Sequence, residues 1–175
     1  YGKAEYFNPG ESVKDRAALY MVENALKNKQ IQKGGVVVEG TAGNTGIGLA
    51  IVTKAYGLSL KIIIPRTQSI EKKKVLADLG AELIEVDAAP YSSPNNYIKQ
   101  AKRIAEELSG SNENGVFWAN QFDNIVNTES HIQTTAKEIW TQTAGQVDGF
   151  TCAVGTGGTL AGVSVGLKEK NKNIK

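Results

Sequence analysis

The amino-acid sequence predicts an α/β protein built on parallel sheets, and three observations predict it. Short continuous apolar runs rich in β-branched residues recur along the chain, as strands buried on both faces require. Segments of helical periodicity separate these runs, and the repeated order of strand then helix is typical of a parallel sheet with right-handed crossovers. Glycine-rich sequence directly follows two of the runs, where the loops of such sheets lead into helices and bind ligands.

The predicted elements alternate along the whole chain. The predicted strands are Val36–Val38, Leu60–Ile64, Leu83–Val86, Val116–Ala119 and Phe150–Val154. The predicted helices are Ser12–Lys29, Thr45–Ala55, Ser69–Leu79, Pro94–Ser109 and Asn127–Thr141, and a further helix begins near Thr159. Polar sequence at Asn120–Asn127 separates a strand from a long helix, and we expect a hinge between two subdomains there.

The composition of the 175 residues excludes several classes of protein. Twenty basic and 18 acidic side chains give a formal charge of only +2, so a nucleic-acid partner is not expected. One cysteine and one histidine supply neither an internal disulfide nor a structural zinc site, so no metal is predicted. The apolar runs fall far short of the roughly 18 residues that cross a membrane. We therefore expect a cytoplasmic protein.

The two ends of the chain predict a fragment. Tyr1 is not an initiator methionine, and Lys175 ends a polar, basic stretch without a closing element. An organellar leader before Tyr1 stays open as an alternative to the cytoplasmic location.

The first motif with chemical potential is Asn8–Arg16. Ser12 and Asp15 form a capping-box pattern, which predicts that a helix begins there with Lys14 in its first turn. The lysine shares its helix face with three apolar residues, Ala18, Met21 and Ala25. An inward-facing lysine has a lowered pKa, and its neutral amine can attack an aldehyde to form a Schiff base. A lysine that extends along the surface to solvent is the alternative.

Two glycine-rich loops are the next candidates. The loop Glu39–Gly48 lacks the Gly-Lys-Ser/Thr end of a P-loop, so a nucleoside triphosphate is not expected. In the loop Gly155–Gly162, backbone N–H groups and the following helix could bind a phosphate. A dinucleotide fingerprint would need glycine at Leu160, so a single phosphate fits better. Tight packing of strand against helix is the alternative for both loops.

Polar side chains and two single residues complete the candidates. Asn120, Gln121 and Asn124 follow a predicted strand, where their amides could hold a carboxylate; a polar turn that caps the next helix is the alternative. His131 has no second histidine or cysteine near it in the sequence, which favours a structural or surface role. Cys152 lies within a predicted apolar strand and is interpreted as a buried thiol.

These motifs in this order resemble the cysteine synthase family, which comprises the O-acetylserine sulfhydrylases and the related cystathionine β-synthases. The resemblance runs from about Lys3 to Leu167 and implies the tryptophan-synthase-β-like fold, fold type II of the pyridoxal 5'-phosphate (PLP) enzymes. It implies two open parallel-sheet α/β subdomains with PLP in the cleft between them. Residues 1–125 would form the N-terminal subdomain that binds PLP and substrate, with its first helix packing on the larger domain. Residues 126–175 would begin that larger domain, and a homodimer is expected.

The resemblance also implies a role for individual residues. Lys14 would form the Schiff base with PLP and act as the catalytic base, and Asn44 would lie beside the 3′-oxygen of the cofactor. The implied substrate-binding residues are Thr41, Gly43, Thr45 and Gln121. The implied phosphate cup consists of Gly155, Thr156, Gly157, Gly158 and Thr159. The contact to the pyridine nitrogen would come from a later part of the large domain.

The implied reaction is a β-replacement through an aminoacrylate intermediate, in which sulfide displaces acetate from O-acetylserine and gives L-cysteine. The partners would be small molecules, namely an amino-acid donor and sulfide or a thiol acceptor. A cystathionine β-synthase that uses homocysteine is one alternative, and a catalytically silent regulatory member of the family is another. Ala42 stands where most relatives have serine, and Glu11 where a small residue is usual. A serine or threonine dehydratase is disfavoured, because its motif reads Ser-Phe-Lys instead of Ser12-Val13-Lys14.

Overall fold

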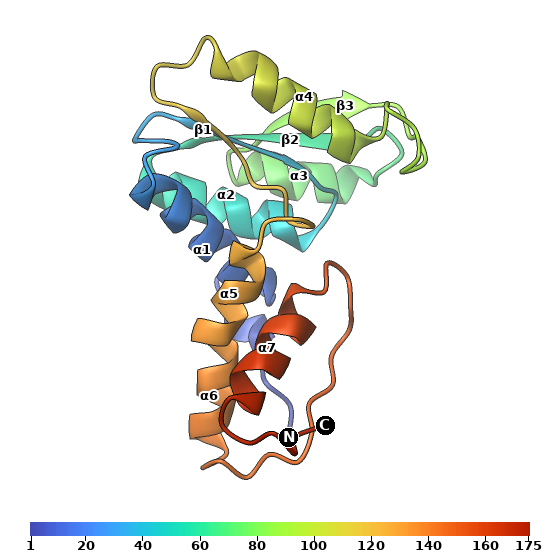
Figure 1. The fold of residues 1–175 in the computed structure, drawn as a ribbon. Coiled ribbons are helices and arrows are strands. Elements are labelled where there is room, and N and C mark those ends of the chain that lie inside the picture. Colours follow the sequence, from blue (N-terminus) through green and yellow to red (C-terminus); the bar gives the residue numbers. More distant parts are fainter.

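The computed structural model describes residues 1–175, and its upper half in Figure 1 is a parallel sheet with helices on both faces. The strands are β1 (Val36–Gly40), β2 (Ser59–Pro65), β3 (Glu82–Val86) and β4 (Val116–Trp118). They lie in the order β3-β2-β1-β4, and every neighbouring pair is parallel. The α/β class and the first four predicted strands are confirmed.

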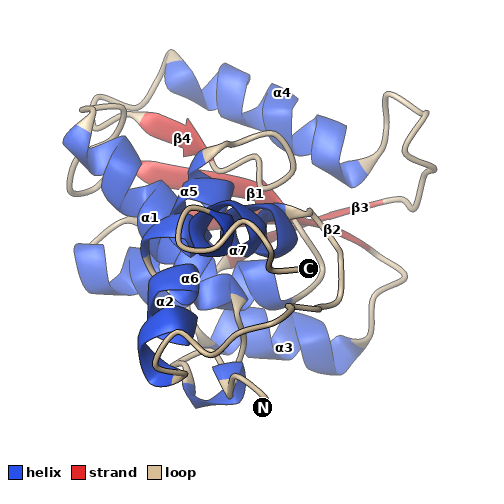
Figure 2. Ribbon diagram, turned by 60° about the horizontal axis from the view of Figure 1, so that its bottom comes forward, coloured by secondary structure: helices blue, strands red, loops and turns tan.

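Side chains of the central strands alternate between two hydrophobic cores. Helices α1 (Lys14–Lys27), α2 (Asn44–Tyr56) and α3 (Ile70–Asp78) cover one face, and α4 (Tyr97–Ser109) covers the other (Figure 2). Val37 faces the core under α1 and α2, whereas Val36 and Val38 pack against α4. Because both faces of β1 are buried, its sequence is continuously apolar until Glu39.

The lower half of the molecule is helical and has a core of its own. It contains α5 (Val126–Gln133), α6 (Thr135–Gln142) and α7 (Gly158–Lys168), together with both chain ends (Figure 1). The buried apolar residues of this core are Ala136, Val163, Leu167 and Ile174. The single helix predicted over Asn127–Thr141 is interrupted at Thr134, whose hydroxyl donates to the carbonyl of Ser130 at 2.6 Å. Such a side-chain bond to the preceding turn commonly bends a helix.

The predicted strand Phe150–Val154 is wrong. The segment has no regular secondary structure, and most of its residues are exposed. Beside it the chain makes one parallel bridge, in which the N–H of Phe150 donates to Lys175 (2.9 Å) and that of Lys175 to Asp148 (3.0 Å). A strand needs a row of such partners, and the apolar run alone does not provide them. Cys152 consequently lies in a loop and is half-buried.

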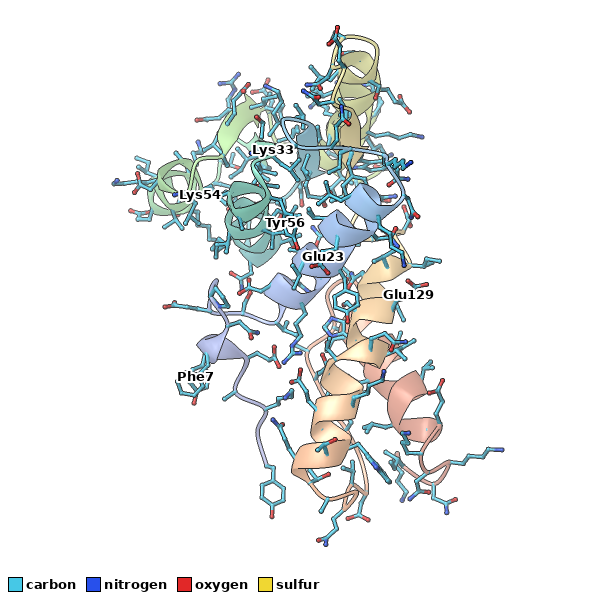
Figure 3. The ribbon with its side chains drawn as sticks, turned by 90° about the vertical axis from the view of Figure 1, so that its left-hand side faces the viewer. Phe7, Glu23, Lys33, Lys54, Tyr56 and Glu129 are labelled. Carbon is cyan, nitrogen blue, oxygen red and sulfur yellow. The ribbon has the colours of Figure 1, made fainter.

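Helix α1 packs on both halves of the molecule. Its apolar face belongs to the core of the sheet half, while its other contacts include α5. At its outer edge the hydroxyl of Tyr56 on α2 donates to Glu23 at 2.6 Å, and the two side chains lie together in Figure 3. Arg16 makes bidentate bonds to Glu5 and to Glu138 on α6 at 2.7–3.0 Å. These bonds fasten the N-terminal segment and α1 to the lower half.

The helices of the structure are all too short or too polar to traverse a lipid bilayer.

Candidate active site

Lys14 is the first residue of α1, and the apolar face predicted for it is buried. Ala18, Met21 and Ala25 are each 0% exposed, and Lys14 itself is half-buried. Burial lowers the pKa of Lys14, and the nearby Cys152 opposes this shift. Because burial disfavours the ammonium form, a larger fraction of Lys14 is the neutral amine than for a lysine on the surface.

The predicted capping box is wrong in its partners. The carboxylate of Asp15 accepts the N–H of Gly10 at 2.5 Å, and the hydroxyl of Ser12 accepts the N–H of Lys14 at 3.3 Å. Glu11 has φ +58°, a left-handed conformation that turns the chain before the helix. Because of this turn, the carboxylate of Asp15 accepts the N–H of Gly10, and not that of Ser12 as a capping box requires. Glu11 is exposed and faces solvent.

The loop predicted to bind substrate leads from β1 into α2. Thr41 is buried, and its hydroxyl accepts the N–H of Gly43 at 3.3 Å. Gly43 and Asn44 are exposed, and Ala42 is half-buried. A cavity of about 190 Å³ separates this loop from α3. The loop therefore presents backbone and side-chain polar groups to open space at the carboxyl end of β1.

Thr45 connects this loop to the turn after β4. It is 4% exposed, and its hydroxyl donates to the side-chain oxygen of Gln121 at 2.6 Å. Gln121 is 8% exposed. Of the three amides predicted to act together, Asn124 is used at the start of α5, where it accepts from Val126 (3.1 Å) and donates to Ala119 (3.0 Å). Gln121 is thus the amide that contacts the loop predicted to bind substrate, Thr41–Thr45, which is called the substrate loop below.

Glu39 lies beneath this turn as a buried carboxylate in β1. It is 1% exposed, and it accepts the backbone N–H of Asn120 at 2.8 Å. Burial raises the pKa of Glu39 to about 7, although the polar groups of Gln121 and the hydrogen bond from Asn120 act in the opposite direction. No role was predicted for Glu39; the feature of the sequence that could have indicated one is a single acidic residue in an otherwise apolar strand.

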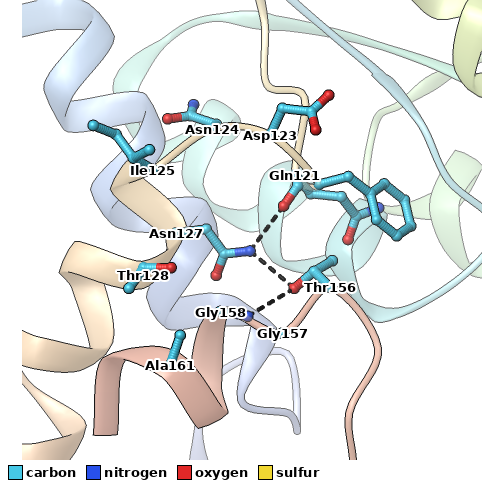
Figure 4. Close-up of a pocket in the computed structure, with 11 residues that line it drawn as sticks. Gln121, Asp123, Asn124, Ile125, Asn127, Thr128, Thr156, Gly157, Gly158 and Ala161 are labelled. Atoms are coloured by element: carbon cyan, nitrogen blue, oxygen red, sulfur yellow. Dashed lines mark hydrogen bonds between the residues drawn. The ribbon is translucent and has the colours of Figure 1, made fainter. Parts of the chain in front are cut away.

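The predicted phosphate cup is the turn that enters α7, and α5 lies behind it. A cavity of about 220 Å³ lies between this turn and the turn after β4 (Figure 4). Asn127 of α5 is buried, and its amide donates to the carbonyl of Gln121 (2.9 Å) and the hydroxyl of Thr156 (3.0 Å). The hydroxyl of Thr156 also accepts the N–H of Gly158 at 3.4 Å. Asn127 therefore joins the two walls of the cavity.

His131 supports the cup from one turn further along α5. It is 1% exposed, and its two ring nitrogens contact the hydroxyls of Thr135 (2.8 Å) and Thr159 (3.2 Å). Burial, followed by the charges of Lys14 and Arg16, lowers the pKa of His131 to about 4. The imidazole is neutral at pH 7, and its predicted structural role now includes a bond to a cup residue. The spacing of four residues from Asn127 already placed both on one face of the helix.

The glycines of the two loops fall into two groups. A Cβ added to Gly158 or Gly162 would collide with α5, and one added to Gly46 or Gly48 would make tight contacts of 3.0 Å. A Cβ added to Gly43, Gly155 or Gly157 would meet nothing within 4 Å. Packing alone thus explains the first group. Gly157 also has φ +85°, which favours glycine, but no feature of the protein itself requires glycine at 43 or 155.

Comparisons with known proteins agree with this arrangement. Cysteine synthase 1 of Neurospora crassa is 56% identical over 168 residues, which cover 96% of this chain and 43% of that protein. The structure of a hydrogen sulfide-producing enzyme from Fusobacterium nucleatum superposes with a TM-score of 0.87 at 42% identity, over 99% of this chain and 54% of the other. Cysteine synthase from Entamoeba histolytica gives a TM-score of 0.85 at 39% identity, over 99% and 49%.

The chain thus spans about half the length of the relatives it matches. All of its residues, 1–175, match the family described as "Pyridoxal-phosphate dependent enzyme". With that match and the 0.85–0.87 TM-scores of its structural neighbours, the chain belongs to the family of pyridoxal-phosphate-dependent enzymes.

Proposed function

We propose that the full-length protein catalyses a β-replacement that forms L-cysteine. Sulfide would replace the leaving group on Cβ of O-acetylserine or a similar β-substituted alanine. The observation that carries this proposal is the half-buried position of Lys14 at the start of α1, beside a fully buried apolar helix face; burial also lowers the pKa of its amine. The cysteine synthases among the relatives support the choice of reaction.

The residues present fit pyridoxal phosphate. The open space in front of Gly155 and Gly157, at the N-terminus of an 11-residue helix, suits a phosphate because the helix dipole and N–H groups attract anions. Thr156 and Thr159 add hydroxyls to the same turn. Lys14 would hold the aldehyde carbon of the cofactor, and Asn44 would lie beside its 3′-oxygen.

Lys14 is the group we propose to move the proton. Bound pyridoxal phosphate supplies an electron sink for the charge that develops at Cα of the substrate. The amine of Lys14 would accept the Cα proton at Nζ as the leaving group departs from Cβ, and would return a proton to Cα after sulfide has added. Its lowered pKa favours this role, because a base must be unprotonated before it can act.

The substrate carboxylate would bind between the substrate loop and Gln121. The loop offers the N–H groups and hydroxyls of Thr41, Gly43 and Thr45, which are suitable donors for a carboxylate. The bond between Thr45 and Gln121 already holds the two sides together. We propose that this region orients the amino acid so that its Cα faces Lys14.

The test of the proposal is the visible absorption of the full-length protein purified with pyridoxal phosphate. A protein-bound band is expected, and Lys14→Ala should abolish it and lower turnover of O-acetylserine with sulfide by roughly 10²–10⁴-fold. Lys27→Ala is the matched control, since Lys27 is exposed on the same helix. A parent protein without the band, or a Lys14→Ala variant that keeps both band and turnover, would refute the proposal.

Two alternatives are separated by the choice of substrates. Greater turnover with homocysteine than with sulfide would identify a cystathionine β-synthase. Cofactor binding without turnover of either acceptor would identify a silent regulatory member, to which Ala42 and Glu11 had pointed. Because Glu11 faces solvent, Ala42 is the only one of the two whose position bears on the substrate.

The organisation of the full-length protein is also a proposal. The sheet half would form the N-terminal subdomain, residues 1–125, with α1 also packing on the larger domain. Helices α5–α7, within residues 126–175, would begin that larger, phosphate-binding domain. We further propose a cytoplasmic homodimer, which sedimentation and cell fractionation would test.

A further inference from the structure

The buried carboxylate of Glu39 lies where β4 leaves the sheet. The last ladder bond between β1 and β4 is donated by the N–H of Ala119 to Val38 at 3.0 Å. The next N–H group, that of Asn120, donates to the side chain of Glu39 at 2.8 Å, and the N–H of Gln121 acts on the same carboxylate by lowering its pKa. Asn120 has φ +47°, a conformation that is uncommon for a residue other than glycine. The side chain of Glu39 therefore serves as the acceptor for an N–H group that no longer faces a backbone carbonyl of β1.

The side chain of Gln121 lies between this carboxylate and the loop from β1 to α2. An amide has a donor end and an acceptor end. The oxygen of Gln121 accepts the hydroxyl of Thr45 at 2.6 Å, and the remaining NH₂ end acts on Glu39 by lowering its pKa. All three side chains are at most 8% exposed. Buried polar groups thus connect Glu39 in β1, the Asn120–Gln121 turn and Thr45.

We propose that Glu39 is a positioning residue, which fixes the Asn120–Gln121 turn and the amide of Gln121 for recognition of the substrate carboxylate. This inference rests on the proposed function, in which Gln121 and Thr45 bind that carboxylate. In this arrangement one hydrogen of the Gln121 amide would point to Glu39, and the other would remain available to the substrate. It acts only through Gln121 and touches neither substrate nor cofactor in this role.

Glu39→Gln preserves the shape of the side chain and changes its hydrogen bonding. A carboxylate accepts at both oxygens, whereas an amide presents an NH₂ group at one end. That NH₂ would face one of the N–H donors of Asn120 or Gln121, so the Gln121 amide should rotate and lose its bond to Thr45. In the ionised form of Glu39, which predominates above its pKa of about 7, a lost hydrogen bond to the charged group corresponds to roughly a 10-fold to 100-fold change in an equilibrium constant, so the measurement is made above pH 7.

The test is a titration of the full-length holoprotein with O-acetylserine in the absence of sulfide, followed by the change in its visible spectrum. We expect Glu39→Gln to raise the dissociation constant and the KM for O-acetylserine by at least 10-fold, with kcat and cofactor content within about threefold of the parent. Glu39→Asp should recover part of the affinity. Glu82→Gln is the control, because Glu82 is an exposed strand residue that pairs with Lys61.

A double-mutant cycle separates positioning from a general structural role. If Glu39 acts through Gln121, adding Glu39→Gln to Gln121→Ala should change the dissociation constant by less than twofold. Independent, additive effects, or a loss of cofactor content equal to the loss of substrate affinity, would overturn the inference. A crystal structure of Glu39→Gln adds a readout without turnover, and an unmoved Gln121 would also overturn it. A parent protein without a cofactor band would instead refute the proposed function, and the crystal structure would still test Glu39.

Discussion

Separate replacement of Gly162 and Gly155 by alanine distinguishes helix packing from ligand binding at the phosphate cup. At Gly162 an added Cβ would lie 2.6 Å from the Cβ of His131 and also collide with the carbonyl of Thr128. Backbone atoms move aside less readily than the end of a flexible side chain, and overpacking of this kind destabilises the folded state by about 1–3 kcal/mol. Alanine recovers up to about 1 kcal/mol through helix propensity. Because the closest contact is with backbone, the cost lies at the upper end of this range, about 3 kcal/mol, and we expect Gly162→Ala to lower the free energy of unfolding by about 2 kcal/mol.

At Gly155 the added methyl group would meet no protein atom within 4 Å. We expect the free energy of unfolding of cofactor-free Gly155→Ala to lie within about 0.5 kcal/mol of the parent value. The methyl group would occupy space that we assign to the phosphate, so cofactor affinity should fall at least 10-fold. At saturating cofactor, this loss removes about 1.4 kcal/mol of ligand-induced stabilisation.

Urea unfolding of the full-length protein with and without pyridoxal phosphate, together with a cofactor titration, measures both effects. The reasoning would be refuted if Gly155→Ala destabilised the cofactor-free protein as much as Gly162→Ala does. It would equally fail if Gly155→Ala bound the cofactor as tightly as the parent. The first result would make Gly155 a packing residue, and the second would move the phosphate site elsewhere.

Two further predictions concern pH. Bonds from Arg16, and then from Lys3, lower the pKa of Glu138 from 4.5 to about 2, so the stability it contributes is complete above about pH 4.5 and is lost as the pH falls toward 2. In urea unfolding at pH 7, Glu138→Gln should lower the free energy of unfolding by about 1 kcal/mol, a modest value because the side chain is 39% exposed. An equal loss at pH 2 would contradict this prediction. The pKa of His131 is lowered from 6.5 to about 4, so the unfolded chain binds the proton first and the contribution of His131 to stability falls between pH 6.5 and 4. The raised pKa of Glu39 contributes in the opposite direction, so the measured quantity is the difference in slope between the parent and His131→Asn. Equal slopes for the two proteins would contradict the prediction.

The central sheet could be predicted because a strand buried on both faces needs a continuously apolar sequence. Val36–Val38 and Leu60–Ile64 had to be continuously apolar, since alternate side chains enter two different cores. Phe150–Val154 has a similar composition but no row of strand partners. An apolar run reports that a segment can be buried, and strand formation depends in addition on neighbours that are distant in the sequence.

The contacts that support the site depended on the path of the chain. Ser12 and Asp15 had the spacing of a capping box, but the left-handed turn at Glu11 gave Asp15 another partner. The bond between His131 and Thr159 spans 28 residues, and helical periodicity could place His131 only on a face. Residue types and motif order were therefore visible in the sequence, whereas the partners of these residues required the fold.

Gln121 is connected to both halves of the molecule, and this bears on how the two could move. Thr45 holds its side chain to the sheet half, Glu39 holds the backbone of the adjacent Asn120, and Asn127 holds the carbonyl of Gln121 to α5 and the cup. The segment Asn120–Asn127 stays a predicted hinge, but these buried bonds resist bending within it. The bond between Thr45 and Gln121 is the one whose donor a substrate carboxylate could take over, because a charged acceptor competes well with a neutral amide. Substrate binding would thereby loosen the link to the substrate loop and leave the links to Glu39 and Asn127 in place, so that the loop is the part expected to move.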